Sequence, residues 1–367
     1  MSKLHAAALL GVLASACSSP SPEDISSDAP PAPTSSGAGS GAPSGAAGTA
    51  GASAPAAYDI VDLGTFGGNA IAHAINDRRQ IAGESVPPYD VDHAFLWAGG
   101  AMIDLGTLGG TISVGYAINA SGAVVGYTTL PTGRYRGFLS QGGAMTNLGD
   151  FGGDYSTARG VDSAGDVVGE AAVSPTLTHA FLYRGGTMTD LGTLGGEYSS
   201  AYAINDAGQI VGYSYRADGT FHAFLVSGGA MTDLGTLGGS YSAAYAVTDA
   251  GVVLGQAYLA GDAAAHAYVY RDGSMRDIDS SAHTYSSALA MNSAGVIVGS
   301  YETTANGAAM HAFVYDGTMK SLDDLVAAGS GWSLEEATDV NDAGQIVGRG
   351  TIDGQEHAFL LEPQLAR

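Results

Sequence analysis

The chain has 367 residues, of which 45% are hydrophobic, only 13% are charged and 56 are glycine. Its formal net charge is −23, and Lys3 and Lys320 are its only lysines. Nucleic-acid binding requires a basic surface, so this composition excludes a nucleic-acid partner. The abundance of glycine favours a fold of short strands and turns over one of long helices.

The first seventeen residues are typical of a bacterial lipoprotein signal. Lys3 precedes the apolar run Ala6–Ala14, and Leu13-Ala-Ser-Ala-Cys17 resembles a lipobox, in which the cysteine becomes the lipidated N-terminus. We predict a signal peptide over residues 1–16 and lipidation at Cys17. The alternative is an ordinary secretory signal with an incidental cysteine. Because Cys17 is the only cysteine, an intramolecular disulfide is excluded.

Residues 17–57 consist almost wholly of Ser, Pro, Ala and Gly, with a few acidic residues. This composition cannot bury a core, so we predict a disordered tether with a reach of about 35 Å. No later stretch is long and apolar enough to span a bilayer. The protein should therefore be exported and held at the outer membrane or cell surface by its lipid alone. We assign residues 58–362 to a repeat domain and residues 363–367 to a C-terminal tail.

The repeat domain carries one motif seven times. Asp190-Leu-Gly-Thr-Leu-Gly-Gly196 recurs at 104–110 and 233–239, with looser copies from Asp62 and Asn147 and degenerate copies from Asp277 and Ser321. The copies are spaced by 42, 43, 43, 43, 44 and 44 residues. A constant period in this range indicates a repeat architecture.

Each repeat unit predicts four short strands. In the unit around Gly196, the four β-rich runs are Ala201–Ile204, Gln209–Ser214, His222–Val226 and Ala230–Leu234. Asn-Asp-x-Gly and Ser-Gly-Gly turns typical of hairpins separate them. A four-strand unit of this length is typical of a β-propeller blade. We expect the Ala-rich run to be the innermost strand, where small side chains suit a crowded channel. A parallel β-solenoid is the alternative.

The two ends of the repeat domain complement each other. The last unit ends at His357-Ala-Phe-Leu-Leu361 and lacks a fourth strand, whereas Tyr58–Leu63 is a surplus strand at the start. We predict that this N-terminal strand completes the last blade. An all-β, seven-bladed β-propeller with four-stranded blades would then be closed without free edges.

These motifs resemble those of the HAF repeat family of extracellular bacterial proteins. The resemblance rests on Asp-Leu-Gly-Thr-Leu-Gly-Gly, Ala-x-Ala-Ile-Asn-Asp-x-Gly-Gln-Ile-Val-Gly and His-Ala-Phe, and it covers about Tyr58–Glu362. The departures are Arg136-Gly-Phe138, His266-Ala-Tyr268 and an insertion in the last unit, Ala327–Glu336. The resemblance implies an exported repeat protein without implying an activity.

Most of the repeated polar residues are interpreted as structural. The recurring histidines, one per unit, would lie far apart in a ring and cannot share a metal ion, so we expect each to bond a neighbouring strand or turn. They are His93, His179, His222, His266, His311 and His357. The Asn-Asp-x-Gly segments supply too few ligands for calcium and are read as turns. The glycine-rich segment lacks the lysine of a phosphate-binding loop. We predict no metal site and no cofactor.

No catalytic constellation stands out. Asp323-Asp324 and Glu335-Glu336 are the candidates for glycosidase-like carboxylates, which must face one substrate from two sides. We interpret them as solvated turn residues. No nucleophile elbow or Ser/His/Asp order is found. We therefore predict no catalytic residues and a non-enzymatic protein.

The candidate ligand-binding residues are aromatic. Tyr155, Tyr198 and Tyr241 recur in Gly-Gly-x-Tyr-Ser, and Tyr285 aligns with them. They fall in the connection between units, which in a propeller shares a face with the loop between the second and third strands. Those loops are the most divergent parts of the repeat: Ser85–Asp92, Thr128–Tyr135, Ala171–Thr178, Tyr215–Phe221, Ala257–Ala265 and Tyr301–Met310. Variable loops with tyrosines on a rigid scaffold are typical of binding surfaces. Trp332 would join this rim; the alternative is that the tyrosines wedge between blades.

These observations predict a monomeric, lipid-anchored binding or scaffolding module for a glycan or a protein. The alternative is an extracellular propeller hydrolase or lyase acting on polysaccharide, with carboxylates drawn from different blades. A purely structural envelope protein is a third class. Carboxylates gathered in a central pocket would favour the enzyme, and a channel lined by Ala and Gly would favour binding. Fold alone does not decide among these classes.

Overall fold

The computed structural model describes residues 54–87, 91–281, 283–303 and 309–364. The predicted signal peptide, Cys17 and residues 18–53 of the predicted tether lie outside the described residues. Within the described ranges the structure is built of strands, with one short 3₁₀ turn, η1 (Asp323–Leu325). The all-β prediction is confirmed. No helix in these ranges has the length and apolar character needed to cross a bilayer.

The strands follow the sequence units, four to a unit except at the ends. The first strand is β1 (Tyr58–Asp62). Units one and two contain β2 (Ala70–Ile75), β3 (Ile81–Ser85), β4 (His93–Ala98), β5 (Ala101–Asp104), β6 (Ser113–Ile118), β7 (Val124–Thr129), β8 (Tyr135–Gln141) and β9 (Ala144–Asn147). Units three and four contain β10 (Ser156–Val161), β11 (Val167–Ala172), β12 (Thr178–Arg184), β13 (Thr187–Asp190), β14 (Gly195–Ile204), β15 (Ile210–Arg216), β16 (Phe221–Ser227) and β17 (Ala230–Asp233). Units five to seven contain β18 (Gly238–Val247), β19 (Val253–Leu259), β20 (Ala265–Arg271), β21 (Ser274–Asp277), β22 (Ser286–Met291), β23 (Ile297–Glu302), β24 (Met310–Tyr315), β25 (Met319–Ser321), β26 (Trp332–Val340), β27 (Ile346–Ile352) and β28 (Gln355–Pro363).

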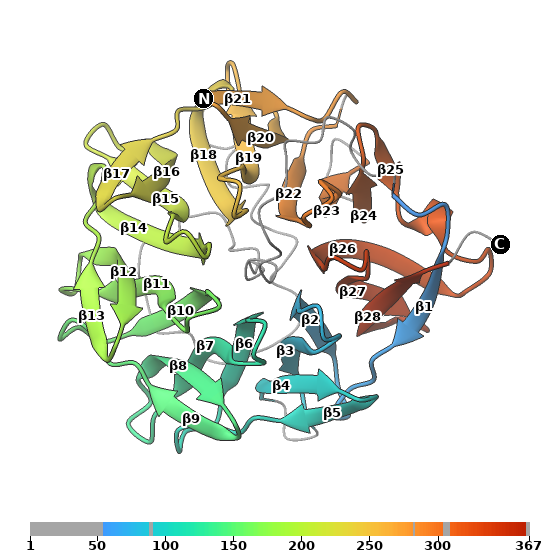
Figure 1. The fold of residues 1–367 in the computed structure, drawn as a ribbon, viewed down its shortest axis with the longest axis horizontal. Helices are drawn as coiled ribbons and strands as arrows, with labels where there is room; N and C mark the ends of the chain where they lie inside the picture. The colour runs from blue at the N-terminus through green and yellow to red at the C-terminus, as the bar shows by residue number, and fades with distance from the viewer. Residues whose placement is uncertain (1–53, 88–90, 282, 304–308, 365–367) are drawn as a thin grey trace.

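The strands pair into sheets that radiate from a common centre (Figure 1). Four sheets have four strands each: β2 to β5, β6 to β9, β22 to β25, and β26 to β28 with β1. The strands β10 to β21 form a twelve-stranded sheet. Within it, three antiparallel groups are joined only by single parallel pairs, Thr178 with Tyr198 and Phe221 with Tyr241. The first strand of each unit lies nearest the centre. This radial, antiparallel arrangement excludes the parallel solenoid.

The first and last strands of the domain share a sheet. β1 pairs antiparallel with β28, in a register that runs from Tyr58 opposite Pro363 to Asp62 opposite Phe359. The N–H of Ala54 donates to Asp316 at 2.9 Å. Both ends of the described chain are therefore tied to the same part of the ring.

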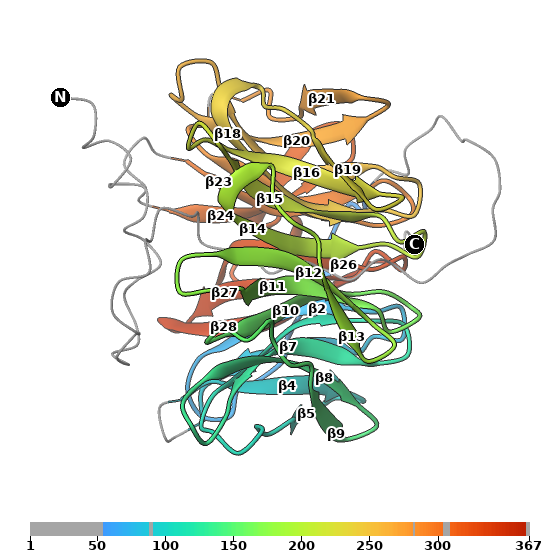
Figure 2. The same ribbon diagram turned by 90° about the vertical axis from the view of Figure 1, so that its left-hand side faces the viewer.

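Seen from the side, the strands run across the thickness of the ring, so the turns and loops that connect them lie on its two faces (Figure 2). We call the face with the Asn-Asp-x-Gly and Gly-Gly hairpins the turn face. The opposite, loop face carries the second-to-third loops and the connections between units. On the loop face, the last glycine of the Asp-Leu-Gly-Thr-Leu-Gly-Gly motif packs on the end of the second strand. In unit two, for example, the N–H of Gly110 donates to the Thr129 carbonyl at 3.1 Å.

The turn face is held by a repeated asparagine. The side chain of Asn205 accepts the N–H of Gln209 at 2.8 Å, which closes its own hairpin. Its Nδ2 donates to the Thr248 carbonyl of the next unit, also at 2.8 Å. In the same way Asn341 donates to the Asn76 carbonyl at 3.2 Å, which joins the last unit to the first. The interpretation of these segments as structural turns is confirmed.

A glycine in each second strand is required by the close approach of the first strand. A Cβ atom on Gly212 would lie 1.9 Å from the Ser200 carbonyl oxygen, and one on Gly126 would lie 1.8 Å from that of Val114. Beside this glycine the first strand carries a β-bulge, seen between Ala201 and Ala203 in unit four. The bulge leaves one residue of the first strand outside the ladder.

Candidate functional site

The extra residue of each bulge occupies one repeated position, three residues before the asparagine turn. We call these the axial residues: His73, Tyr116, Arg159, Tyr202, Tyr245, Leu289 and Thr338. Neighbouring members contact one another at the inner strands. The rings of His73 and Tyr116 are 5.6 Å apart, and those of Tyr202 and Tyr245 are 5.5 Å apart. The expectation that small side chains fill the centre is therefore wrong at this position, because in every unit but the last the bulge directs a large side chain toward its neighbours.

Arg159 is the centre of the most connected group. Its guanidinium lies 5.3 Å from the Tyr116 ring and 4.9 Å from the Tyr202 ring. It pairs with Glu170 at 3.0 Å, and the two side chains are 12% and 7% exposed. Stacking between aromatic faces stabilises a partly desolvated guanidinium. Removing either partner would leave a buried charge without its counter-ion.

Tyr198 joins this group through its hydroxyl, which donates to Glu170. Burial, and then the charge of Glu170, raise the pKa of Tyr198 well above its usual range. Burial likewise raises the pKa of Tyr202 to about 12. Both phenols are therefore protonated at neutral pH, and that of Tyr198 donates to Glu170.

A second variable position follows the glycine of each second strand. Its residues are Glu84, Tyr127, Glu170, Tyr213, Gln256, Ser300 and Arg349. Arg349 contacts three carboxylates: Glu356 at 2.9 Å, Glu336 at 3.0 Å and Glu335 at 3.3 Å. The interpretation of Glu335 and Glu336 as solvated turn residues is wrong. They lie on β26 and form ion pairs with Arg349 on the adjacent strand.

The other acidic pair also has a structural role. Asp323 begins η1, and its carboxylate accepts the N–H of Leu334 at 2.8 Å and contacts His311 at 3.0 Å. The interpretation of Asp323 as a solvated turn residue was therefore incomplete, because the residue ties the insertion of the last unit to the neighbouring strand.

A small cavity of about 160 Å³ lies between units seven and one. Its lining includes the carboxylates Glu84, Asp92 and Glu356 together with Ser85. Burial raises the pKa of Glu356, against the opposing effect of Arg349. The cavity therefore combines carboxylates from two units, one of which is biased toward its protonated form.

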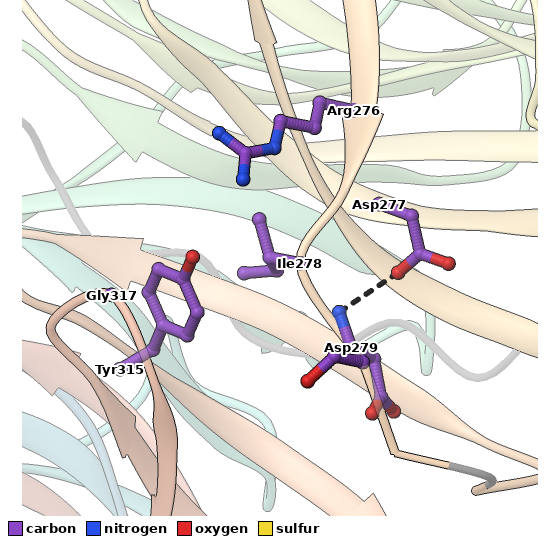
Figure 3. Close-up of a pocket in the computed structure, with 7 residues that line it drawn as sticks. Arg276, Asp277, Ile278, Asp279, Tyr315 and Gly317 are labelled. Atoms are coloured by element: carbon purple, nitrogen blue, oxygen red, sulfur yellow. Dashed lines mark hydrogen bonds between the residues drawn. The ribbon is translucent and has the colours of Figure 1, made fainter.

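A larger cavity of about 270 Å³ lies between units five and six (Figure 3). The segment at the end of β21 provides Arg276, Asp277, Ile278 and Asp279, and the β24–β25 hairpin provides Tyr315. Its walls carry a cation, carboxylates and an aromatic ring, a combination suited to a polar ligand with an apolar face.

Two of the predicted tyrosines belong to one aromatic cluster on the loop face. The ring of Tyr198 stacks on Tyr213 at 5.6 Å, and that of Tyr241 stacks on Phe221 at 4.6 Å. Tyr215 bridges the two groups, at 5.9 Å from Tyr198 and 5.5 Å from Phe221. Tyr198, Tyr215 and Tyr241 are half-buried. We call Tyr198, Tyr213, Tyr215, Phe221, Tyr241 and Tyr258 the loop-face cluster; Tyr258 joins at 5.6 Å from Tyr241.

The remaining predicted residues lie around this cluster or apart from it. Tyr155 is half-buried and exchanges a hydrogen bond with Thr178 at 2.9 Å. Tyr285 is also half-buried. Trp332 packs in the last sheet, 6.2 Å from Phe359 and 6.3 Å from His357. The structure therefore brings Tyr198 and Tyr241 together and leaves Trp332 in another sector of the ring.

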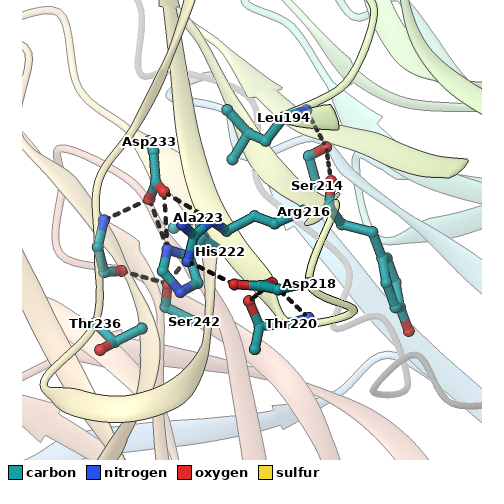
Figure 4. Close-up of polar contacts among 12 residues, drawn as sticks. Leu194, Ser214, Arg216, Asp218, Thr220, His222, Ala223, Asp233, Thr236 and Ser242 are labelled. Atoms are coloured by element: carbon teal, nitrogen blue, oxygen red, sulfur yellow. Dashed lines mark hydrogen bonds and ion pairs between the residues drawn. The ribbon is translucent and has the colours of Figure 1, made fainter. Parts of the chain in front are cut away.

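The repeated histidines bond a neighbouring strand or turn, as predicted: the outer strand in five units, and η1 in the case of His311. Nδ1 of His222 lies 2.7 Å from Asp233, whose carboxylate also accepts the N–H of Gly235 at 2.8 Å (Figure 4). Ser242 completes the contact, because its hydroxyl accepts the N–H of Ala223 at 2.9 Å and donates to the Gly235 carbonyl. The same His–Asp contact recurs at His93, His179, His266, His311 and His357.

Unit two shows what replaces this contact. Arg136 stands at the histidine position and Asn147 at the aspartate position, and Arg136 pairs instead with Asp150. An ion pair between Arg136 and Asp150 therefore replaces the His–Asp contact in this unit. Within the described residues, no three His, Cys, Asp or Glu side chains gather where they could hold a metal ion.

Sequence reasoning did not identify the axial residues or the variable position of the second strand. Their signal was present, since both positions change from unit to unit inside otherwise regular strands. The axial position shows in sequence only as one larger residue within an Ala-rich strand, and a bulge does not alter a pattern of alternating residues.

Comparison with protein families gives one partial match. Residues 217–360 match the model of a protein of unknown function, DUF3466. The match spans less than half of the chain and marks a similarity to that family. No curated protein matches the chain significantly.

Solved structures share the fold. The β-propeller domain of the Trilobed protease from Pyrococcus furiosus, which has an open velcro topology, aligns with a TM-score of 0.50 and 14% identity over 70% of this chain and 84% of that chain. A puromycin-hydrolyzing peptidase from Mycobacterium tuberculosis aligns with a TM-score of 0.51 and 12% identity over 81% of this chain and 50% of that one. A puromycin hydrolase aligns with a TM-score of 0.52 and 14% identity, over 82% and 53%. This chain spans about half the length of the two hydrolases. At these identities the likeness establishes a β-propeller fold and no activity.

Proposed function

We propose that the protein is a seven-bladed β-propeller that binds a glycan or a protein on its loop face. In this view each antiparallel group of the twelve-stranded sheet is one blade, and β1 is the outer strand of the last. Four separate sheets and three such groups support the count of seven. The pairing of β1 with β28 supports closure by the N-terminal strand.

The observation that carries a binding role is the loop-face cluster. Its half-buried tyrosines come from units four and five and lie beside the second-to-third loops, where the repeat is least regular. Tyrosine offers a large contact area and a polar tip at low conformational cost. The rings are fixed by their mutual contacts, so little further ordering is needed on binding.

A glycan array probed with the wild-type protein and with the Tyr198→Ala/Tyr241→Ala double variant tests this role. We expect selective binding by the wild type and a loss of at least about tenfold in the variant, the effect of about 1.4 kcal/mol of lost contact energy. Equal binding by a variant that retains its melting temperature would exclude the loop-face cluster as the site.

We further propose that the domain is exported, as its resemblance to the HAF repeat proteins implies, and that it is tethered through a lipid on Cys17. The run of apolar residues before Cys17 and the Ser/Pro/Ala/Gly-rich segment after it support this arrangement. The Cys17→Ser variant should leave the membrane fraction, and its retention there would contradict lipid anchoring.

A polysaccharide hydrolase or lyase is the second candidate, favoured by the cavity between units seven and one. Two carboxyl groups, one of them protonated, are the usual equipment for glycoside cleavage. Glu356, whose pKa is raised by burial against the opposing effect of Arg349, and Glu84 both line this cavity and would be the two groups. Release of reducing sugar by the wild type and not by Glu356→Gln would favour the enzyme over the binding module.

A further inference from the structure

The cavity between units five and six coincides with three departures from the repeat. Arg276 stands where units three and four carry Thr189 and Thr232. Asp279 replaces the glycine of Asp-Leu-Gly. The β24–β25 hairpin is one residue shorter than its counterparts, with four steps from Tyr315 to Met319 where Tyr270 and Met275 are five apart. The lining of this cavity therefore differs from the repeat at three places.

The carboxylates of the cavity wall already have partners. Asp277 contacts His266 at 2.8 Å and accepts the N–H of Asp279, also at 2.8 Å (Figure 3). Asp279 contacts His283 at 3.0 Å, and its side chain is fully buried. These acids are therefore engaged with histidines and do not neutralise the nearby arginine.

Arg276 has no ion pair or hydrogen bond among the described residues. Its guanidinium and the hydroxyl end of Tyr315 extend toward the same space, with Ile278 between them (Figure 3). In a chain of net charge −23, a guanidinium left over a cavity beside an aromatic ring is a donor for an external anion. The planar fork matches a carboxylate in particular.

We propose that this cavity binds a sugar acid, a uronate residue of a glycan. The carboxylate bonds Arg276, one face of the sugar ring packs on Tyr315 and Ile278, and a ring hydroxyl reaches Ser280, which also lines the cavity. The volume of about 270 Å³ suits a single residue rather than a long chain. The net charge of −23 opposes polyanions and favours a ligand with one carboxylate. This inference takes its ligand class from the proposed glycan binding, but its site is the cavity between units five and six and not the loop-face cluster.

Titration with two disaccharides tests the proposal: one ends in glucuronic acid and the other in glucose. We expect the wild type to bind the acidic disaccharide about tenfold more tightly. Arg276→Gln should abolish this preference. Arg271→Gln is the matched control, because Arg271 is also exposed and without an ion pair in the described structure, and it should keep the preference.

Two further arms separate the alternatives. Tyr241→Ala should keep the preference for the acidic disaccharide even if binding at the loop-face cluster is lost, so the two proposals can fail independently. A short peptide with a free C-terminal carboxylate should bind no better than its amidated form. Equal binding of both disaccharides, no binding of either, an unchanged preference in Arg276→Gln, or capture of the peptide instead would overturn the proposal.

Discussion

His266 differs from the other repeated histidines because both of its ring nitrogens face an acceptor. Nδ1 lies 2.8 Å from Asp277, and Nε2 lies 3.0 Å from the His283 carbonyl. A neutral imidazole has one donor, so this geometry requires the protonated ring. Burial lowers the pKa of His266, but the hydrogen bonds to Asp277 and to the His283 carbonyl outweigh it and raise the pKa. Asp279 adds to this effect from the same segment.

This pKa makes stability depend on pH. A histidine whose pKa is raised on folding stabilises the fold fully below its unfolded value, about 6.5, and this contribution is lost as pH rises through the folded value. We therefore expect His266→Gln to lower the free energy of unfolding most below the unfolded value of about pH 6.5, and progressively less as the pH rises through the folded value. Urea unfolding of wild type and variant across this range measures the difference. A difference independent of pH would contradict a protonated His266.

At the scale of the strand, the glycine of each second strand matters more than the many turn glycines. A methyl group on Gly212 would meet backbone atoms that cannot move without displacing the first strand and its bulge. Gly219, in the following loop, has a φ of +83° but open space around its Cβ position. The two glycines therefore serve different needs: close approach in the first case, and conformation in the second.

We expect Gly212→Ala to cost about 3 kcal/mol or more through overpacking, and Gly219→Ala to cost about 1–2 kcal/mol for a left-handed residue with a side chain. Urea unfolding of both variants, with far-UV circular dichroism as a check on folding, measures the two costs. Equal costs would mean that the first strand can shift and that the bulge is not a rigid feature.

The strands were predictable from sequence because asparagine and glycine residues typical of turns stand at their ends. Asn205 and Gly208 mark one hairpin and Gly228 and Gly229 the next, and each recurs with the repeat. The bulge was not predictable, since it changes pairing without changing composition. The ion pair of Glu335 was not predictable for a related reason: its partner, Arg349, lies on the next strand and meets it only when β26 pairs with β27.

At the scale of the molecule, strand pairing and side-chain hydrogen bonds join the last unit to the beginning of the domain. β1 adds a strand to the last sheet, and Asn341 reaches the Asn76 carbonyl across the first junction. β1 covers the edge that β28 would otherwise present and brings the last sheet to the same four strands as the sheets β2 to β5, β6 to β9 and β22 to β25. The pairing of β1 with the last unit was predictable from sequence, because the last unit lacks a fourth strand and the domain begins with a surplus one.

Removing β1 should therefore open the molecule. A chain that starts at Gly64 should melt at a lower temperature than one that starts at Ala54, and it should associate as concentration rises, because β28 becomes an exposed edge. Differential scanning calorimetry and light scattering measure the two effects. A truncated chain with unchanged melting and no association would show that the ring does not depend on β1.

The candidate site was only partly predictable at this scale. The face was identified from variable loops and tyrosines, and Tyr198 and Tyr241 lie together there. The neighbours that complete the cluster, Tyr213 and Phe221, resemble ordinary strand residues in sequence. Tyr213 meets Tyr198 through the pairing of β14 with β15, and Phe221 meets Tyr241 only where one unit packs on the next. Neither contact can be read from a single strand.

Hydrogen–deuterium exchange with and without the best-bound glycan from the array tests most directly whether function lies on the loop face. We expect protection in the loops Tyr215–Phe221 and Ala257–Ala265 and in the adjoining segment around Tyr241, with the Asn-Asp-x-Gly hairpins of the turn face unchanged. Protection confined to the turn face, with none around Tyr241, would contradict it.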